Sequence, residues 1–127
     1  MVKTEFVDYS KDDSGILKIV FKARFNQTLK IMDAHSYVSI VVQMSEGKVQ
    51  PMLLNMLSFS NLPNVKLVKF LAKNEELQSV TGVKAVVLNS YIVRMIYTQY
   101  MKFVEVKRPY KIFKTEAEGL AWLKLQL

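Results

Sequence analysis

The sequence predicts an α/β protein with a layered fold. We expect a mixed, mostly parallel five-stranded sheet with about four helices, in the order β-β-α-β-α-β-α-β-α. Two β-rich segments flank a dense polar turn near the N-terminus, and β-branched apolar runs alternate with helically periodic segments over the rest of the chain. Strands that alternate with helices form parallel pairs through crossover connections.

The first two strands are predicted at 4–9 (TEFVDY) and 15–21 (GILKIVF). The turn signal SKDDSG between them indicates an antiparallel hairpin. In the second strand, an apolar row of Leu17, Ile19 and Phe21 alternates with a mixed row. This pattern is typical of a strand near the edge of a sheet.

The segment 28–44 has apolar residues three to five positions apart, which favours a helix. Its β-branched stretch at 37–42 would also suit a strand. We predict the helix because 49–59 makes the better strand. There Met52, Leu53 and Leu54 form a continuous apolar run, typical of a strand buried on both faces.

The second half of the chain continues the alternation. After a loop at 60–64 that contains Pro63, Asn64 can cap a helix that begins at Val65. The further elements that we predict are a helical piece at 75–79, a central strand at 83–88, a helix from 90 to about 103, a strand at 110–113 and a C-terminal helix. Thr115 and Glu118 form a capping-box pattern at the start of that last helix.

Size and composition limit the possible classes of protein. The 127 residues are half hydrophobic, so we expect 1–127 to fold as a single domain. No apolar run approaches the length of a membrane span, and the N-terminus does not resemble a signal peptide. A cytoplasmic location is therefore expected. The absence of cysteine excludes disulfides and thiolate chemistry.

The net charge of +7 is concentrated in the second half of the chain, where 64–127 holds eleven basic and five acidic residues. The densest stretch is 102–114, and it predicts an anion-facing patch or an ordinary solvated face. Lysine predominates and only three arginines occur, which makes nucleic acid an unlikely partner. The candidate patch residues are Lys102, Lys107, Arg108, Lys111 and Lys114.

The residues suggest no catalytic constellation, metal site or cofactor. The single histidine, His35, lies in a predicted helix, where its neighbours in sequence do not face it. The acidic pairs at 12–13 and 75–76 fit a turn and the start of a helix. No phosphate-binding glycine loop, nucleophile elbow or zinc spacing is present. We therefore expect a protein that is not an enzyme.

Seven Met, six Tyr and seven Phe are many for this length. They fit a core, and they could also line a pocket for an apolar ligand or cover an oligomer interface. The helix at 90–104 is apolar nearly all round, more than packing on one side of a sheet requires. We expect its surplus face to form a homodimer contact at or near Tyr97, Tyr100 and Met101.

The C-terminal third resembles a known family. Its features are the run VKAVVLNS at 83–90, a helix containing Arg94 and Met95, and the segment KRPYKIFKTEAEGLAWL at 107–123. These are similar to the small bacterial proteins of the STAS-related, SpoIIAA-like family, most of them uncharacterised. The resemblance implies a SpoIIAA-like (STAS-like) fold for the whole chain.

STAS proteins proper include anti-sigma-factor antagonists with a phosphoacceptor serine after the third strand. If Asn55 marks the end of that strand here, the acceptor region falls at 63–66 (PNVK), which contains no hydroxyl. Ser58 and Ser60 lie nearby but off the motif. We therefore expect no phosphorylation switch of that kind.

The leading hypothesis is a non-enzymatic STAS-like protein that self-associates and acts as a regulatory or partner-binding module. The alternative is a lipid or apolar-ligand binding protein at an anionic membrane surface. In that case the basic segment 102–114 would attract the lipid headgroups.

Overall fold

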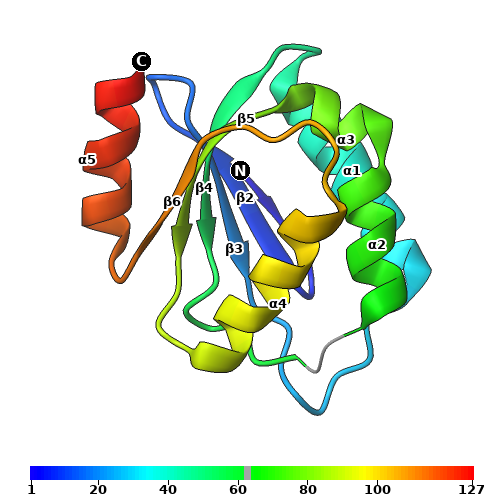
Figure 1. Ribbon diagram of the computed structural model, residues 1–127. Coiled ribbons are helices and arrows are strands. Elements are labelled where there is room, and N and C mark those ends of the chain that lie inside the picture. Colours follow the sequence, from blue (N-terminus) through cyan, green and yellow to red (C-terminus); the bar gives the residue numbers. More distant parts are fainter. Residues whose placement is uncertain (62–63) are drawn as a thin grey trace.

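The computed structural model describes residues 1–61 and 64–127. Its centre is a six-stranded sheet in which the strands follow chain order (Figure 1). The strands are β1 (Val2–Lys3), β2 (Val7–Lys11), β3 (Leu17–Phe21), β4 (Gln50–Asn55), β5 (Thr81–Val87) and β6 (Tyr110–Phe113). The helices are α1 (Ile31–Ser45), α2 (Val65–Lys73), α3 (Glu75–Val80), α4 (Tyr91–Phe103) and α5 (Glu116–Gln126).

The sheet is mixed, as the sequence predicts. The pairs β1–β2 and β2–β3 are antiparallel, and β3–β4, β4–β5 and β5–β6 are parallel. The predicted count of five strands is wrong, because β1 adds a sixth edge strand through pairing of Val2 with Tyr9. That strand has two exposed residues and no alternating pattern that a sequence could reveal. The described residues form five helices rather than about four, since α3 is separate from α2.

The ambiguous segment at 37–42 is helical. Val38, Val41 and Ser45 are buried along α1 at helical spacing. Strand β4 is shorter than predicted, because Asn55 ends it by accepting a hydrogen bond at Oδ1 from the Leu57 N–H. Within β4 the two-sided burial is confirmed: Met52 and Leu54 join one core and Leu53 the other.

Side-chain caps start four of the helices. Their acceptors are Asn64 for α2, Asn74 for α3, Ser90 for α4 and Thr115 for α5. The capping box at α5 is only partly as expected. The Glu118 N–H donates to Thr115, but the Glu118 carboxylate accepts from the Thr115 hydroxyl rather than from its backbone N–H. The predicted loop residue Pro63 lies outside the described residues.

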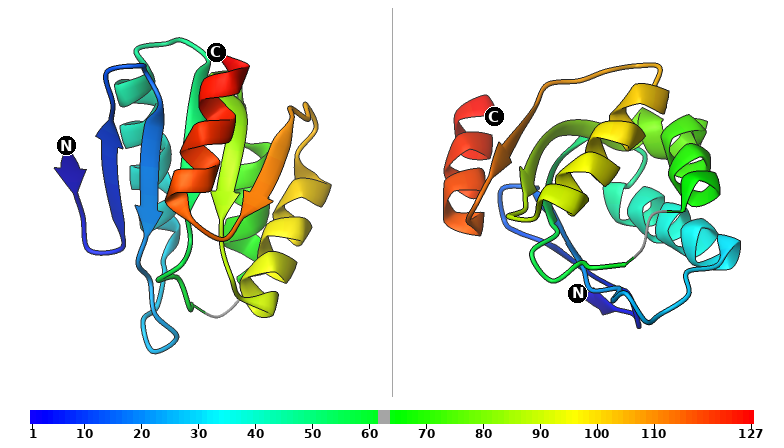
Figure 2. Two further views of the ribbon diagram at one scale, coloured as in Figure 1. Left: turned by 90° about the vertical axis from the view of Figure 1, so that its left-hand side faces the viewer. Right: turned by 60° about the horizontal axis from the view of Figure 1, so that its bottom comes forward.

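The sheet separates two unequal layers. Helices α1 to α4 cover one face and α5 covers the other (Figures 1 and 2). On the α5 side, Gly119 lies so close to the sheet that a Cβ there would be 3.2 Å from the Ala85 Cβ and 3.3 Å from Leu53 Cδ1. On the other side, α1 to α4 make their closest backbone approaches to one another rather than to the strands. Large side chains therefore fill a wider space on that side.

Among residues 1–61 and 64–127, no helix is both long and apolar enough to span a membrane.

Candidate functional site

A pocket of about 360 Å³ lies in the wide space between the sheet and α1 to α4. Apolar and aromatic side chains from β2, β3, β4, α1, α2 and α4 form most of its wall. In the order of these elements along the chain, the wall includes Tyr9, Phe21, Tyr37, Leu54, Val68 and Tyr97. Four of these elements, β2, β3, α1 and α4, contribute aromatic rings, which are stiff and can leave a space that shorter aliphatic chains would close.

The pocket opens at the carboxyl ends of the parallel strands. Its lining includes residues that follow those ends, namely Ala23 and Leu29 after β3 and Met56 and Phe59 after β4. The right-hand view of Figure 2 turns this edge toward the viewer, with α1, α2 and α4 all beginning there. Open α/β sheets bind ligands outside the carboxyl ends of the strands where the strand order reverses, and the described sheet shares with them only the position at the carboxyl ends, because its strands follow chain order.

Hydrogen bonds hold the rim of the pocket in place. The buried Asn61 side chain donates from Nδ2 to the carbonyl oxygens of Arg24 and Gln27, at 2.7 Å each. The Ser60 N–H donates to the Ala23 carbonyl at 2.9 Å. The segments after β3 and after β4 are thereby joined at the mouth.

Tyrosines meet on the pocket wall. The rings of Tyr9 and Tyr37 have centroids 6.0 Å apart, and those of Tyr97 and Tyr100 are 5.7 Å apart. Burial raises the pKa of each of these phenols, so they remain neutral hydroxyls at physiological pH. The Tyr100 hydroxyl accepts a hydrogen bond from Gln78 Nε2 at 2.9 Å.

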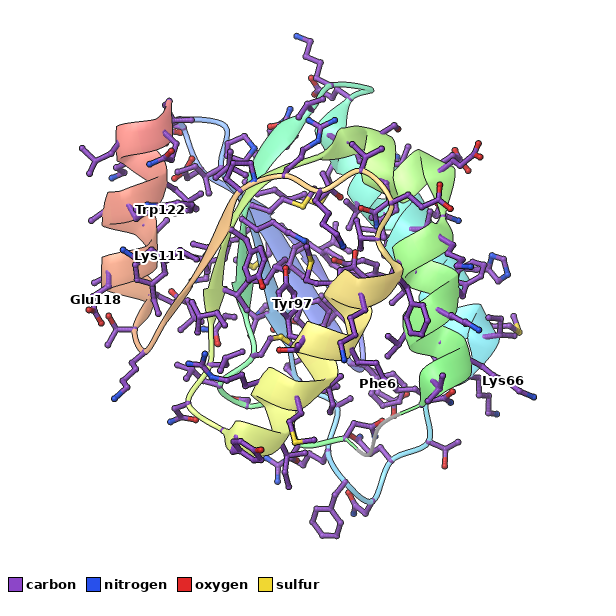
Figure 3. The ribbon with its side chains drawn as sticks, viewed as in Figure 1. Phe6, Lys66, Tyr97, Lys111, Glu118 and Trp122 are labelled. Carbon is purple, nitrogen blue, oxygen red and sulfur yellow. The ribbon has the colours of Figure 1, made fainter. Side chains whose placement is uncertain are left out.

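The Tyr97 hydroxyl is buried and has no hydrogen-bond partner among the described residues. Tyr97 projects from α4 toward the sheet in the middle of the molecule (Figure 3). A buried hydroxyl without a partner costs free energy, and a ligand acceptor in the pocket would remove that cost. The pocket wall, which includes Tyr97, is therefore mainly apolar with a small polar part.

A buried lysine lies behind these rings. Lys84 on β5 is only 3% exposed, and its Nζ is 5.2 Å from the ring centroids of both Tyr97 and Tyr100. Within the described residues, the only hydrogen bond of the Lys84 ammonium goes to the Met101 sulfur, at 3.4 Å. Burial, with a smaller contribution from Lys107, lowers the pKa of Lys84 to about 8. The cation is stabilised by aromatic faces rather than by a carboxylate.

The proposed interface residues on α4 are placed differently from one another. Tyr97 and Met101 are buried in the protein's own core, and Tyr100 is half-buried on the pocket wall. Their orientation follows from packing against the sheet, where Tyr97 also contacts Tyr110 with ring centroids 5.4 Å apart. The surplus apolar face of the helix consists instead of Tyr91, Ile92 and Met95, which are exposed.

The structure does not gather the predicted basic patch on one element. Lys102 lies near the end of α4, and Lys107 and Arg108 lie in the connection to β6. The Lys107 Nζ donates to the carbonyl oxygens of Met101 and Val104, so it caps the C-terminus of α4. Lys111 projects on the α5 side (Figure 3), where its Nζ is 5.7 Å from the Phe113 ring centroid. Lys114 follows β6 and is exposed.

The remaining polar candidates have local structural roles. His35 is exposed and packs edge-on against Phe70. Asp12 accepts hydrogen bonds from the backbone of Ser14 and Ile16 and so shapes the hairpin turn. In the described part of the chain, no group of three His, Asp or Glu side chains is arranged to hold a metal ion.

The residues considered for phosphorylation lie after β4. Ser58 and Ser60 are exposed in the segment that leads toward α2. Asn64 caps α2 and Val65 is exposed at its start, whereas Pro63 lies outside the described residues.

Sequence reasoning considered a pocket only as one use of the many aromatic residues, and it did not locate one. The signal that existed was the spacing of tyrosines on the inward faces of β2, α1 and α4. That signal cannot be distinguished from ordinary core packing without the separation between the two layers.

Comparison with known families gives a match over most of the chain. Residues 9–126 match the model of a family described as "Domain of unknown function (DUF7793)". No curated protein and no solved structure shows significant similarity to the chain. Because the match covers nearly the whole fold, from β2 to α5, the chain belongs to the DUF7793 family.

Proposed function

We propose that this protein is a non-catalytic module that binds an apolar ligand in the pocket between the sheet and helices α1 to α4. The observation that carries the proposal is the pocket itself. Its volume of about 360 Å³ lies within the usual range for small-molecule sites. Predominantly apolar walls with a few polar groups are typical of such sites.

The polar groups of the pocket suit recognition rather than chemistry. Inside, the phenols have raised pKa values and can donate hydrogen bonds without acting as bases at neutral pH. At the rim, Asp33 already accepts a hydrogen bond from the Lys30 N–H at the start of α1. The ligand class that fits is a mainly hydrocarbon or aromatic molecule with one hydrogen-bond acceptor placed near Tyr97.

The SpoIIAA-like assignment is part of this proposal. It is supported by strands that follow one another in chain order and by the alternation of strands and helices after β3. The connection after β4 has a structural use for Asn64 and no hydroxyl at the described positions 64–66, which supports a function without the usual phosphoacceptor serine.

The test is titration of the purified protein with the uncharged fluorescent probe N-phenyl-naphthylamine. Val68→Phe adds a ring inside the pocket, because Val68 is half-buried on the pocket wall. Loss of that space should weaken probe binding by about tenfold or more. The control Val49→Phe makes the same change at an exposed site outside the pocket lining. Equal affinities for all three proteins, or no probe binding by the wild type, would contradict the proposal.

Self-association is a second candidate, which the exposed face of α4 favours. Tyr91, Ile92 and Met95 present adjacent apolar surface that the chain itself does not cover. A two-fold contact would reuse the same patch on both copies. Sedimentation velocity at tens of micromolar protein, with Ile92→Asp as the disrupting variant, measures it directly.

A further inference from the structure

We infer that the edge of the molecule around the pocket mouth docks on an anionic phospholipid bilayer. This edge is called the mouth surface below. It comprises the exposed residues that follow the carboxyl ends of β3, β4 and β5 and the first turns of α1, α2 and α4. The inference goes beyond the proposed function and shares with it only the position of the pocket opening.

Exposed apolar side chains are concentrated on the mouth surface. Phe25 is 69% exposed, Met32 74%, Tyr91 76% and Ile92 62%. Ile31, Leu57, Val65 and Met95 are further exposed apolar residues of the same segments. Large apolar groups scattered singly are ordinary on a protein surface, but a cluster around an opening indicates an interaction site.

The charges of the mouth surface are mainly positive. Its exposed basic residues are Arg24, Lys30, Lys66 and Arg94. The acidic residues that line the same opening are Glu5 and Asp33, of which Asp33 is held by the start of α1. An excess of cations beside apolar groups complements a bilayer whose headgroups are negative and whose interior is hydrocarbon.

The pocket provides the reason for a bilayer rather than another protein as the partner. Rim residues such as Leu29 and Phe59 line the pocket from the same segments that expose Phe25 and Leu57. With the mouth surface against a bilayer, an apolar ligand passes between lipid and pocket without crossing water. Tyr91 also suits the lipid–water boundary, because its ring is apolar and its hydroxyl is polar.

The mouth surface is different from the basic segment 102–114 that the sequence suggests. Lys107 in that segment is held by the carbonyl oxygens at the end of α4, at the opposite edge of the sheet. Lys111 lies on the α5 side. A bilayer on the mouth surface therefore does not require those residues.

The experiment is co-sedimentation with vesicles of phosphatidylcholine, with and without phosphatidylserine. The wild type should bind the anionic vesicles, and binding should weaken as ionic strength rises. Met32→Asp combined with Ile92→Asp should lower the partition coefficient about tenfold or more. The matched control, Val106→Asp combined with Leu125→Asp, changes residues that are 64% and 82% exposed elsewhere and should bind like the wild type.

Charge is tested separately. Lys66→Glu combined with Arg94→Glu should weaken binding about tenfold or more. The control Lys48→Glu combined with Lys124→Glu reverses two exposed charges away from the mouth and should have little effect. Thermal melts establish that each variant is folded before its binding is compared.

The inference is overturned if the wild type does not sediment with anionic vesicles, or if the control pairs lose as much binding as the mouth pairs. It is also overturned if Ile92→Asp abolishes a dimer while vesicle binding stays unchanged, since the face would then belong to a second copy. Probe binding measured without vesicles reports on the pocket alone, so failure of docking is distinguishable from failure of the proposed function.

Discussion

Replacing Lys84 by methionine is expected to stabilise the protein at neutral pH. The two side chains have similar length and volume, so the change removes mainly the ammonium group. Lys84 is 3% exposed and has no carboxylate partner among the described residues. Its charge is therefore held in the core at a cost that the aromatic rings around it offset only in part.

The structure gives the size of that cost. The pKa of Lys84 falls from 10.5 to about 8. Each pKa unit corresponds to about 1.4 kcal/mol, so the charged amine costs about 3 kcal/mol below pH 8. Removing it should raise the free energy of unfolding by about 2–3 kcal/mol at pH 7, after some loss of contact with the tyrosine rings.

The pH dependence of stability carries a second signature. Between about pH 8 and 10.5 the unfolded lysine holds a proton that the folded one has lost. Stability contributed by this site therefore rises with pH across that window and is constant below it. Buried tyrosines act in the opposite direction near and above pH 10, because their raised pKa values keep them protonated only in the folded state. The effect of Lys84 on stability can therefore be measured without that of the tyrosines between pH 7 and 9.5.

Urea unfolding followed by circular dichroism measures both effects. At pH 7 the Lys84→Met midpoint should move up by about 1–2 M, given the usual slopes for small proteins. Its stability should stay level from pH 7 to 9.5, where that of the wild type rises. Lys48→Met, at an exposed site, should change neither. The reasoning would be refuted if the urea midpoint of Lys84→Met were no higher than that of the wild type and the stability of the variant still rose between pH 7 and 9.5. The Lys84 amine would then be solvated or paired in the folded protein.

Three further predictions concern α5 and the segment after β4. Trp122→Ala should cost about 2–3 kcal/mol because the ring is half-buried against the sheet, and Thr115→Ala should cost about 1 kcal/mol as a lost cap; urea melts compare them. Burial opposes ionisation of Glu116, but hydrogen bonds from lysine and asparagine outweigh it and lower its pKa. The stabilisation that the Glu116 carboxylate contributes is therefore present above its unfolded pKa and is lost on acidification. Between pH 6 and 3, the melting temperature should therefore fall less steeply for Glu116→Gln than for the wild type. Mass spectrometry of protein from cells should find Ser58 and Ser60 without stoichiometric phosphate, and phosphate there would revive a switch.

Features set by neighbouring residues could be predicted from the sequence. Asn64 and Thr115 each precede a helix at the position where their side chains cap it, and the structure confirms both. The position near the edge that the mixed row predicts for β3 is wrong, because β3 is third of the six described strands and Lys18 in that row forms an ion pair with Glu116 of α5. The caps depend on chain geometry within a few residues, which the sequence states directly.

Features set by the distance between layers could not be predicted. The composition of α4 shows that it is apolar on most sides, but not that Tyr97 turns inward while Ile92 turns outward. That choice depends on how the helix packs over Tyr110 and Lys84, which lie on two other elements. The burial of Lys84 is hidden for the same reason, since a lysine within a strand pattern is normally read as facing solvent.

The two faces of the sheet are packed differently. On the α5 side, Gly119 permits close packing against the sheet, and the apolar cluster formed there by the described residues does not line the pocket. On the other side the protein keeps a pocket, an unpartnered Tyr97 hydroxyl and an unpaired buried cation at Lys84 within one region. Each of these three features lowers stability, and local rules of packing are most often broken at functional sites. These features lie together on one face, next to an opening surrounded by exposed apolar side chains. Their concentration there supports the proposal that this face binds a ligand, while packing on the α5 side stabilises the fold.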